Sequence, residues 1–115
     1  MGREILHVID DILQEIAGVE RVTAHKTLDD YKADWLLRHA LQRAIEIISE
    51  ASRALPEEAA ATQPHIRWRA IRAIGNVLRH EYHSISDEII WNVLRDELPP
   101  LKAAVEAIRQ NVSAP

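Results

Sequence analysis

Apolar residues recur at intervals of three and four along most of the chain, which is the period of an amphipathic helix. The first such stretch covers residues 3–22, and Gly18 is placed to loosen or end it. A second helix is predicted from Thr27, which stands three residues before Asp30 as in a capping box, to Pro56. Its apolar stripe consists of Leu37, Leu41, Ala44, Ile48 and Ala51.

Three further helices are expected in the second half of the chain. Residues 66–82 form a helical pattern despite Gly75, which costs about 1 kcal/mol relative to Ala inside a helix and therefore suggests close packing. Ser86 can cap a fourth helix that ends near Arg95, and residues 99–108 begin with two prolines that fit the first turn of a short fifth helix. We therefore predict an all-α, up-and-down antiparallel bundle of four main helices plus a short C-terminal helix, forming one domain over residues 1–115.

The composition agrees with helices and excludes several chemistries. Hydrophobic residues make up 47% of the chain without a single Phe, and only three glycines are present. Because the chain has no cysteine, it has no disulfide, cysteine-ligated zinc or cysteine nucleophile. No apolar run reaches the roughly 20 residues of a membrane span, and the start MGREILHVIDD has an acid where a signal peptide needs apolar residues. We expect a cytoplasmic protein that does not enter a membrane.

Positive charge is concentrated in one segment of an otherwise acidic chain. The formal net charge is -4, but residues 59–80 contain no acid. The same segment contains Arg67, Arg69, Arg72 and Arg79. A local basic strip on an acidic body suits a confined phosphate-bearing ligand better than nonspecific coating of nucleic acid.

Polar side chains of the third predicted helix share one face. Arg72, Asn76, His80 and His83 follow at spacings of four, four and three, with Arg79 beside them. Taken alone, a histidine on a helix face is more often a solvated residue than a catalyst. The two histidines could share a metal, but H-E-Y-H is not a zinc motif and no third ligand is evident, so we expect neither a metal nor another cofactor.

Four large aromatic residues do not all fit inside so small a bundle. They are Tyr31, Trp35, Trp68 and Trp91. Either some of them form an oligomer interface, or all three tryptophans are ordinary core residues.

The segment LRHEY, preceded by GN and followed by IIW and LPPL, resembles the HEPN superfamily and specifically its HepT-like toxins. The resemblance covers nearly the whole chain. The motif helix of that family typically reads R-N-x-x-x-H-x-Y. Asn76, His80 and Tyr82 occupy its Asn, His and Tyr places, whereas Gly75 occupies the place of its Arg.

The resemblance implies a metal-independent endoribonuclease in which an Arg and a His converge on the scissile phosphate of RNA, in a cleft between the subunits of a homodimer. It also implies a toxin-antitoxin pair, with a minimal nucleotidyltransferase as the cognate antitoxin. Tyr82 would be the residue that this partner can adenylylate, which would add negative charge beside the site and repel RNA.

Two hypotheses follow from the departure at Gly75. In the first, His80 is the general acid or base of a ribonuclease, Asn76 positions it or the phosphate, and Arg79 or Arg72 replaces the family's Arg. In the second, the chain is an inactive binding module that kept the bundle, the dimer and the nucleotidyltransferase partner but lost the chemistry together with the Arg.

Overall fold

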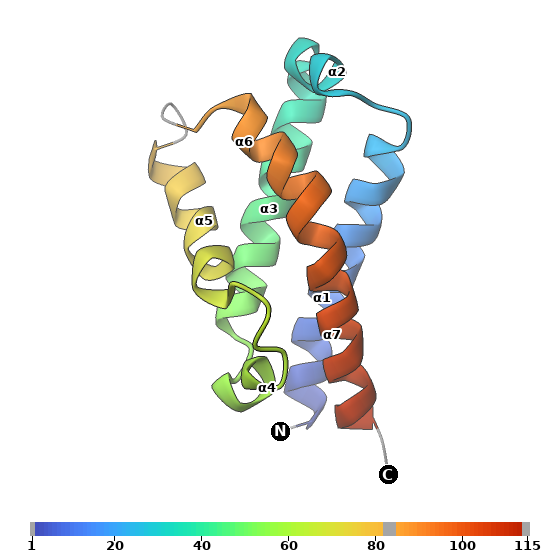
Figure 1. The fold of residues 1–115 in the computed structure, drawn as a ribbon, viewed down its shortest axis with the longest axis vertical. Helices are drawn as coiled ribbons and strands as arrows, with labels where there is room; N and C mark the ends of the chain where they lie inside the picture. The colour runs from blue at the N-terminus through green and yellow to red at the C-terminus, as the bar shows by residue number, and fades with distance from the viewer. Residues whose placement is uncertain (1, 82–84, 114–115) are drawn as a thin grey trace.

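The computed structural model describes residues 2–81 and 85–113 and confirms the all-α bundle; these residues contain no β-strand. Four long helices form it: α1 (Gly2–Thr23), α3 (Trp35–Arg53), α5 (Trp68–Glu81) and α7 (Leu98–Ser113). The shorter elements are α2 (Leu28–Ala33), α4 (Glu57–Ala61), α6 (Asp87–Asn92) and the π-helical turn η2 (Val93–Glu97). The long helices alternate in direction, so both termini lie at the same end (Figure 1).

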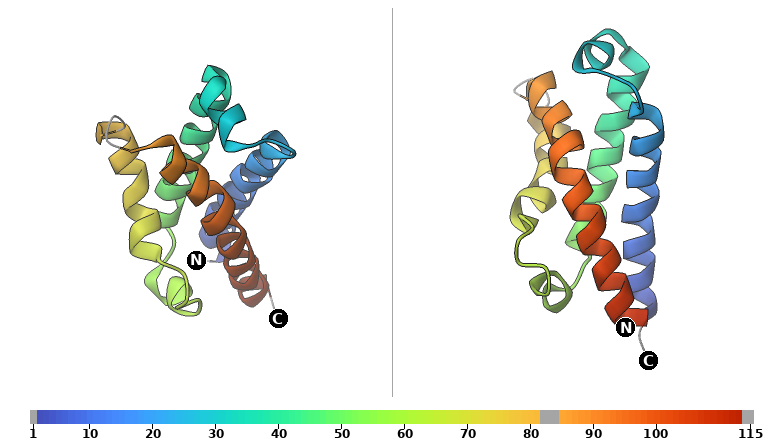
Figure 2. Two further views of the ribbon diagram at one scale, coloured as in Figure 1. Left: turned by 45° about the horizontal axis from the view of Figure 1, so that its top comes forward. Right: turned by 45° about the vertical axis from the view of Figure 1, so that its right-hand side comes forward.

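Helix α3 lies between α1 and α5, and α7 packs against α1 (Figures 1 and 2). The apolar stripes predicted from the sequence form the core between these helices. Its most deeply buried aliphatic side chains are Ile9, Ile12, Ile16, Leu41, Ile90, Leu101, Val105 and Ile108. Helix α5 therefore lies at the edge of the bundle, where one of its faces remains open. Within the described ranges, no helix is both long and apolar enough to cross a bilayer.

The aromatic residues divide between core and surface. Tyr31 and Trp91 are buried with their ring centroids 5.7 Å apart, and the Tyr31 hydroxyl accepts a hydrogen bond from Gln42 at 3.1 Å. Burial raises the pKa of the Tyr31 hydroxyl. Trp35 is 64% exposed and stacks on His39, whereas Trp68 is half-buried. Tyr31 and Trp91 are thus core residues, and Trp35 is a surface residue.

The second predicted helix is two helices. The capping box is present, because the Thr27 hydroxyl accepts from the Asp30 N–H at 3.2 Å and the Asp30 carboxylate accepts from the Thr27 N–H at 2.8 Å. That hydrogen bond from Thr27 lowers the pKa of Asp30. Helix α2 nevertheless ends at Ala33, and the Asp34 side chain caps α3 by accepting from the Leu37 N–H. Gly18 does not interrupt α1.

The fourth and fifth predicted helices are continuous, because α6, η2 and α7 follow one another without a break. Ser86 caps α6 as predicted, accepting from the Ile89 N–H. Pro99 and Pro100 lack the N–H groups that would complete an α-helical turn. The wider π turn, in which the Leu98 N–H donates to the Val93 carbonyl, precedes them and lets the helix continue.

Candidate functional site

Helix α5 carries all four residues predicted to act in catalysis. Ile71, Ile74 and Leu78 hold one face of it to the bundle, and Leu78 is only 5% exposed. The opposite face presents Asn76, Arg79 and His80 to solvent, in agreement with the helical spacing. Tyr82 and His83 lie outside the described residues, so the predicted modification site stays a prediction.

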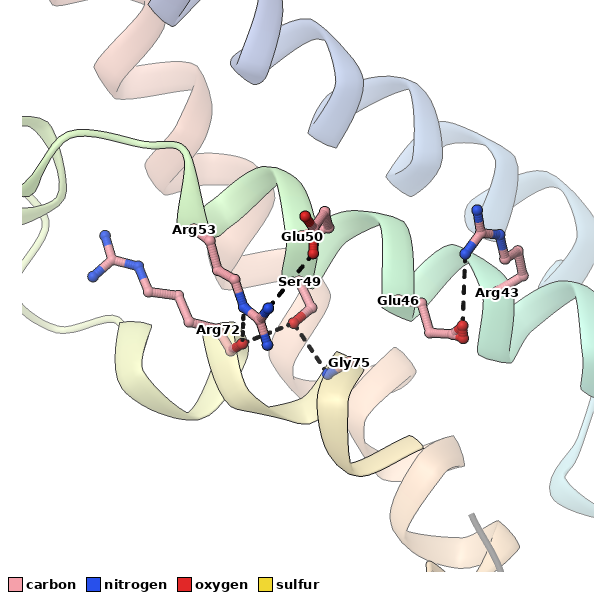
Figure 3. A network of polar contacts seen from close by, with 7 residues as sticks. All are labelled: Arg43, Glu46, Ser49, Glu50, Arg53, Arg72 and Gly75. Atoms are coloured by element: carbon pink, nitrogen blue, oxygen red, sulfur yellow. Dashed lines mark hydrogen bonds and ion pairs between the residues drawn. The ribbon is translucent and has the colours of Figure 1, made fainter. Parts of the chain in front are cut away.

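Gly75 packs tightly against α3. Its N–H donates to the Ser49 hydroxyl at 3.0 Å, and that hydroxyl donates to the Arg72 carbonyl at 3.1 Å (Figure 3). A Cβ atom at position 75 would lie 2.8 Å from both the Cβ and the Oγ of Ser49, and 3.4 Å from the Glu46 carbonyl oxygen. The close packing expected from Gly75 is therefore present, and position 75 faces α3 rather than the open surface.

The Arg72 guanidinium is engaged by the protein itself. Its Nε donates to the Ser52 carbonyl at 3.1 Å, its Nη2 donates to the Leu55 carbonyl at 3.3 Å, and its Nη1 lies 2.6 Å from the Glu57 carboxylate. The carbonyls belong to the end of α3 and the turn after it, where backbone acceptors lack helical partners. Figure 3 shows the side chain extending away from Gly75. These contacts favour a stabilising role for Arg72 over the predicted phosphate contact.

Replacing Arg72 by Ala is expected to destabilise the fold by about 1–3 kcal/mol, because two carbonyls lose a charged donor. The ion pair adds little to this figure, since the Glu57 side chain is 85% exposed. Thermal unfolding followed by circular dichroism measures the change, with Arg69→Ala as the matched control at an exposed position of the same helix. Equal midpoints for the two variants would contradict the stabilising role.

Arg72 and Asn76 border an open hollow between the start of α5, the end of α3 and α4. This arginine hollow has a volume of about 670 Å³ and is lined by Arg53, Glu57, Trp68, Arg69, Arg72, Ala73, Asn76 and Val77. Three arginines against one glutamate give its lining a formal charge of +2, on a chain whose net charge is -4. Two arginines of the basic segment identified in the sequence, Arg69 and Arg72, thus line this hollow.

Arg69 lines the arginine hollow but was not selected for the site from the sequence. It is exposed and forms no ion pair with another described residue. It precedes Asn76 by seven residues and His80 by eleven, so all three lie on one face of α5. That spacing was visible in the sequence, but the engagement of Arg72 that distinguishes the two arginines was not.

Arg79 borders a different hollow. This acidic hollow, about 390 Å³, is lined by Asp11, Arg43, Glu46, Ile47, Glu50, Ala51 and Arg79. Three acids against two arginines give its lining a formal charge of -1. The structure thus brings Asn76 and Arg72 to one hollow and places Arg79 at another, while His80, the residue after Arg79, is exposed at the end of α5.

Comparison with known proteins identifies the family. The family model described as ribonuclease HepT-like matches residues 12–108. The chain belongs to this family.

Several relatives of this HepT-like chain match over nearly their whole length. A probable ribonuclease HepT of Thermococcus cleftensis is 29% identical, over 96% of this chain and 100% of the relative. A putative RNase of Caldanaerobacter subterraneus subsp. tengcongensis is 34% identical, over 89% and 91%. A putative RNase of Methanocaldococcus jannaschii is 27% identical, over 92% and 97%. No solved structure gave a significant match.

The part of the chain that matches the HepT-like family includes all of α5 and the residues of α3 on which it packs. In the part of the chain that the structure describes, no group of three or more His, Asp or Glu side chains could hold a metal ion. The chemistry that these residues offer is proton transfer at His80, hydrogen bonding at Asn76 and charge stabilisation at the arginines.

Proposed function

We propose that this HepT-like chain is an endoribonuclease that cleaves RNA without a metal, with His80 as the general acid or base. The observation that carries the proposal is the exposed pair Asn76 and His80, one helical turn apart on the open face of α5 in a chain of this family. The names of its relatives, ribonuclease and putative RNase, support RNA as the substrate.

In the proposed reaction, the ribose 2′-hydroxyl attacks the adjacent phosphorus while its proton passes to a base. The bond from phosphorus to the 5′ oxygen breaks, and that oxygen takes up a proton. The products are a 2′,3′-cyclic phosphate and a 5′-hydroxyl. His80 carries out one of the two proton transfers, and Asn76 orients its ring or the phosphate.

The negative charge that develops on the phosphate needs a cation near His80. Arg79 is adjacent in sequence, but the lining of its hollow is net acidic. Arg72 is held by the end of α3. A homodimer with a shared cleft would bring the cations of two subunits to one phosphate, and we include this dimer in the proposal.

We further propose that the chain acts in the cytoplasm as the toxin of a toxin-antitoxin pair, with a minimal nucleotidyltransferase as its partner. Tyr82, two residues after His80, is the candidate for adenylylation by that partner. An added phosphate diester beside the site would repel RNA through its negative charge. Mass spectrometry of the chain after co-expression with a cognate minimal nucleotidyltransferase would locate the added group.

The purified protein is expected to cleave single-stranded RNA in the presence of a chelator and to leave cyclic phosphate ends. Gel analysis of a labelled RNA and of its termini measures both. Cleavage that stops when the chelator is added would overturn the metal-independent mechanism. Sedimentation showing only a monomer at micromolar concentration would overturn the shared cleft.

A second candidate function, a binding module without nuclease activity, is favoured by two observations. Position 75 faces Ser49 of α3 and has no room for a side chain, and Arg72 is engaged elsewhere. Such a module would dimerise and bind the nucleotidyltransferase. RNA that the protein binds but never cleaves, at protein concentrations far above the dissociation constant, would favour this function over the ribonuclease.

A further inference from the structure

We propose that the arginine hollow binds one unpaired nucleotide of an RNA strand, at a position next to the nucleotides that His80 contacts. The inference rests on the proposed ribonuclease function and adds a substrate-binding subsite to it. Arg69 would bind the phosphate of this nucleotide, and Trp68 would stack on its base.

The size and charge of the hollow suit a nucleotide. Its volume of about 670 Å³ falls within the range of sites for small ligands. Its lining has a formal charge of +2 from three arginines and one glutamate. Arg53 and Arg72 both use side-chain donors on backbone carbonyls, since the Arg53 Nε donates to the Arg72 carbonyl at 2.9 Å. Arg69 is the lining arginine whose guanidinium has no such hydrogen bond within the described part of the chain.

Trp68 supplies a fixed aromatic ring beside this cation. Its indole N–H donates to the Gln63 carbonyl at 3.0 Å, and the side chain is half-buried while still lining the hollow. A ring held in place loses little freedom when a base stacks on it. Single-stranded RNA is commonly bound by this combination of a positive groove and an aromatic platform, in which stacking tolerates any base.

Helix geometry places the hollow one or more nucleotides away from the cleavage point. With a rise of 1.5 Å per residue, Asn76 and His80 are separated by about 6 Å along α5, and Arg69 and His80 by about 16 Å. One phosphate cannot bridge the longer distance. Arg69 and His80 would therefore contact different phosphates of one strand that follows the open face of α5, with Asn76 between them.

Binding of a 2′-O-methyl oligonucleotide tests the subsite without cleavage, because this probe lacks the nucleophilic hydroxyl. Fluorescence anisotropy of a labelled probe over a series of salt concentrations gives the affinity and its salt dependence. Arg69→Gln is expected to weaken binding and to reduce the slope of log affinity against log salt by about 0.7, which is one phosphate contact. The control is Arg21→Gln, which changes an exposed arginine in the last turn of α1. That end of α1 lies at the opposite end of the bundle from α4 (Figure 1), so this variant should change neither quantity.

Substitutions of Trp68 separate stacking from charge. Trp68→Leu is expected to weaken binding by roughly 5- to 100-fold with an unchanged salt slope, whereas Trp68→Phe retains most of the affinity. Circular dichroism checks that each variant is folded. Should Trp68→Leu fail to fold, the affinity and salt slope of Arg69→Gln decide the question.

Three results would overturn the subsite. The first is parental affinity in both Arg69→Gln and folded Trp68→Leu. The second is weaker binding by Arg69→Gln with an unchanged salt slope. The third is competition by free AMP as strong as that of the oligonucleotide, which would indicate a free-nucleotide site. Failure of the proposed function is separate: a parent protein that binds the probe through both residues but cleaves no RNA supports the subsite and contradicts the ribonuclease. A parent that cleaves RNA, with KM unchanged in both variants, supports the ribonuclease and contradicts the subsite.

Discussion

Replacing His80 by Gln is expected to lower the rate of RNA cleavage by about 10²- to 10⁴-fold, the usual contribution of a general acid or base. An amide can form hydrogen bonds in the place of the imidazole but cannot take up and release a proton near neutral pH. Because His80 is exposed, the same substitution should change the free energy of unfolding by less than about 0.5 kcal/mol. Initial cleavage rates on a labelled RNA, with thermal unfolding measured in parallel, provide the comparison.

His7→Gln is the matched control, because His7 is also an exposed histidine on a helix but lies on α1. It should cleave RNA at the parental rate. A His80→Gln protein that is folded and equally active would remove His80 from the mechanism. A protein that loses RNA binding together with cleavage would show that His80 acts mainly in binding.

The sequence predicts the open face of α5 well, because that face depends only on spacing within one helix. Asn76 and His80 are exposed and one turn apart, as expected. The partners of the Arg72 side chain could not be predicted in this way. Its partners, Ser52, Leu55 and Glu57, belong to the end of α3 and the start of α4, and they meet α5 only when the chain folds back.

The helices were likewise predicted best where their limits depend on residues close in sequence. Helix starts with capping side chains at Thr27 and Ser86 were predicted correctly, because a cap is formed by neighbours in sequence. The break at Asp34 was missed because no Gly or Pro marks it, and the apolar stripe that predicted the helix begins at Leu37, inside α3. The π turn before Pro99 was missed because hydrophobic periodicity does not distinguish a wide turn from an interruption.

Gly75→Ala is expected to destabilise the protein, whereas Gly18→Ala should stabilise it. Both glycines lie inside helices, where Ala is intrinsically favoured by about 1 kcal/mol. At position 18, the nearest atom to an added Cβ is the flexible end of Arg21, 3.9 Å away. At position 75, the added Cβ would lie 2.8 Å from the Cβ of Ser49, so α5 must move away from α3. Overpacking of this kind typically costs about 1–3 kcal/mol.

Chemical denaturation measures the free energy of unfolding, which should fall in Gly75→Ala and rise in Gly18→Ala. Because helix propensity favours Ala equally at both positions, the difference between the two variants reports the packing at position 75. Adding Ser49→Gly to Gly75→Ala removes the atoms that the new methyl group would meet. The double variant should therefore be more stable than the sum of the two single changes by about 0.5–3 kcal/mol, the range found for residues in contact. Additive effects would contradict the tight packing of Gly75 against Ser49.

The tight packing of Gly75 against Ser49 also determines how the family's Arg can be tested in this chain. Gly75→Arg completes the R-N-x-x-x-H-x-Y motif, but its side chain begins at the same Cβ position against Ser49. By itself, Gly75→Arg is expected to disrupt the packing of α5 on α3 and to give no increase in RNA cleavage. Only with Ser49→Gly does the motif acquire an Arg on a folded helix. Cleavage that rises in this double variant and falls again with His80→Gln would show that the missing Arg limits the activity.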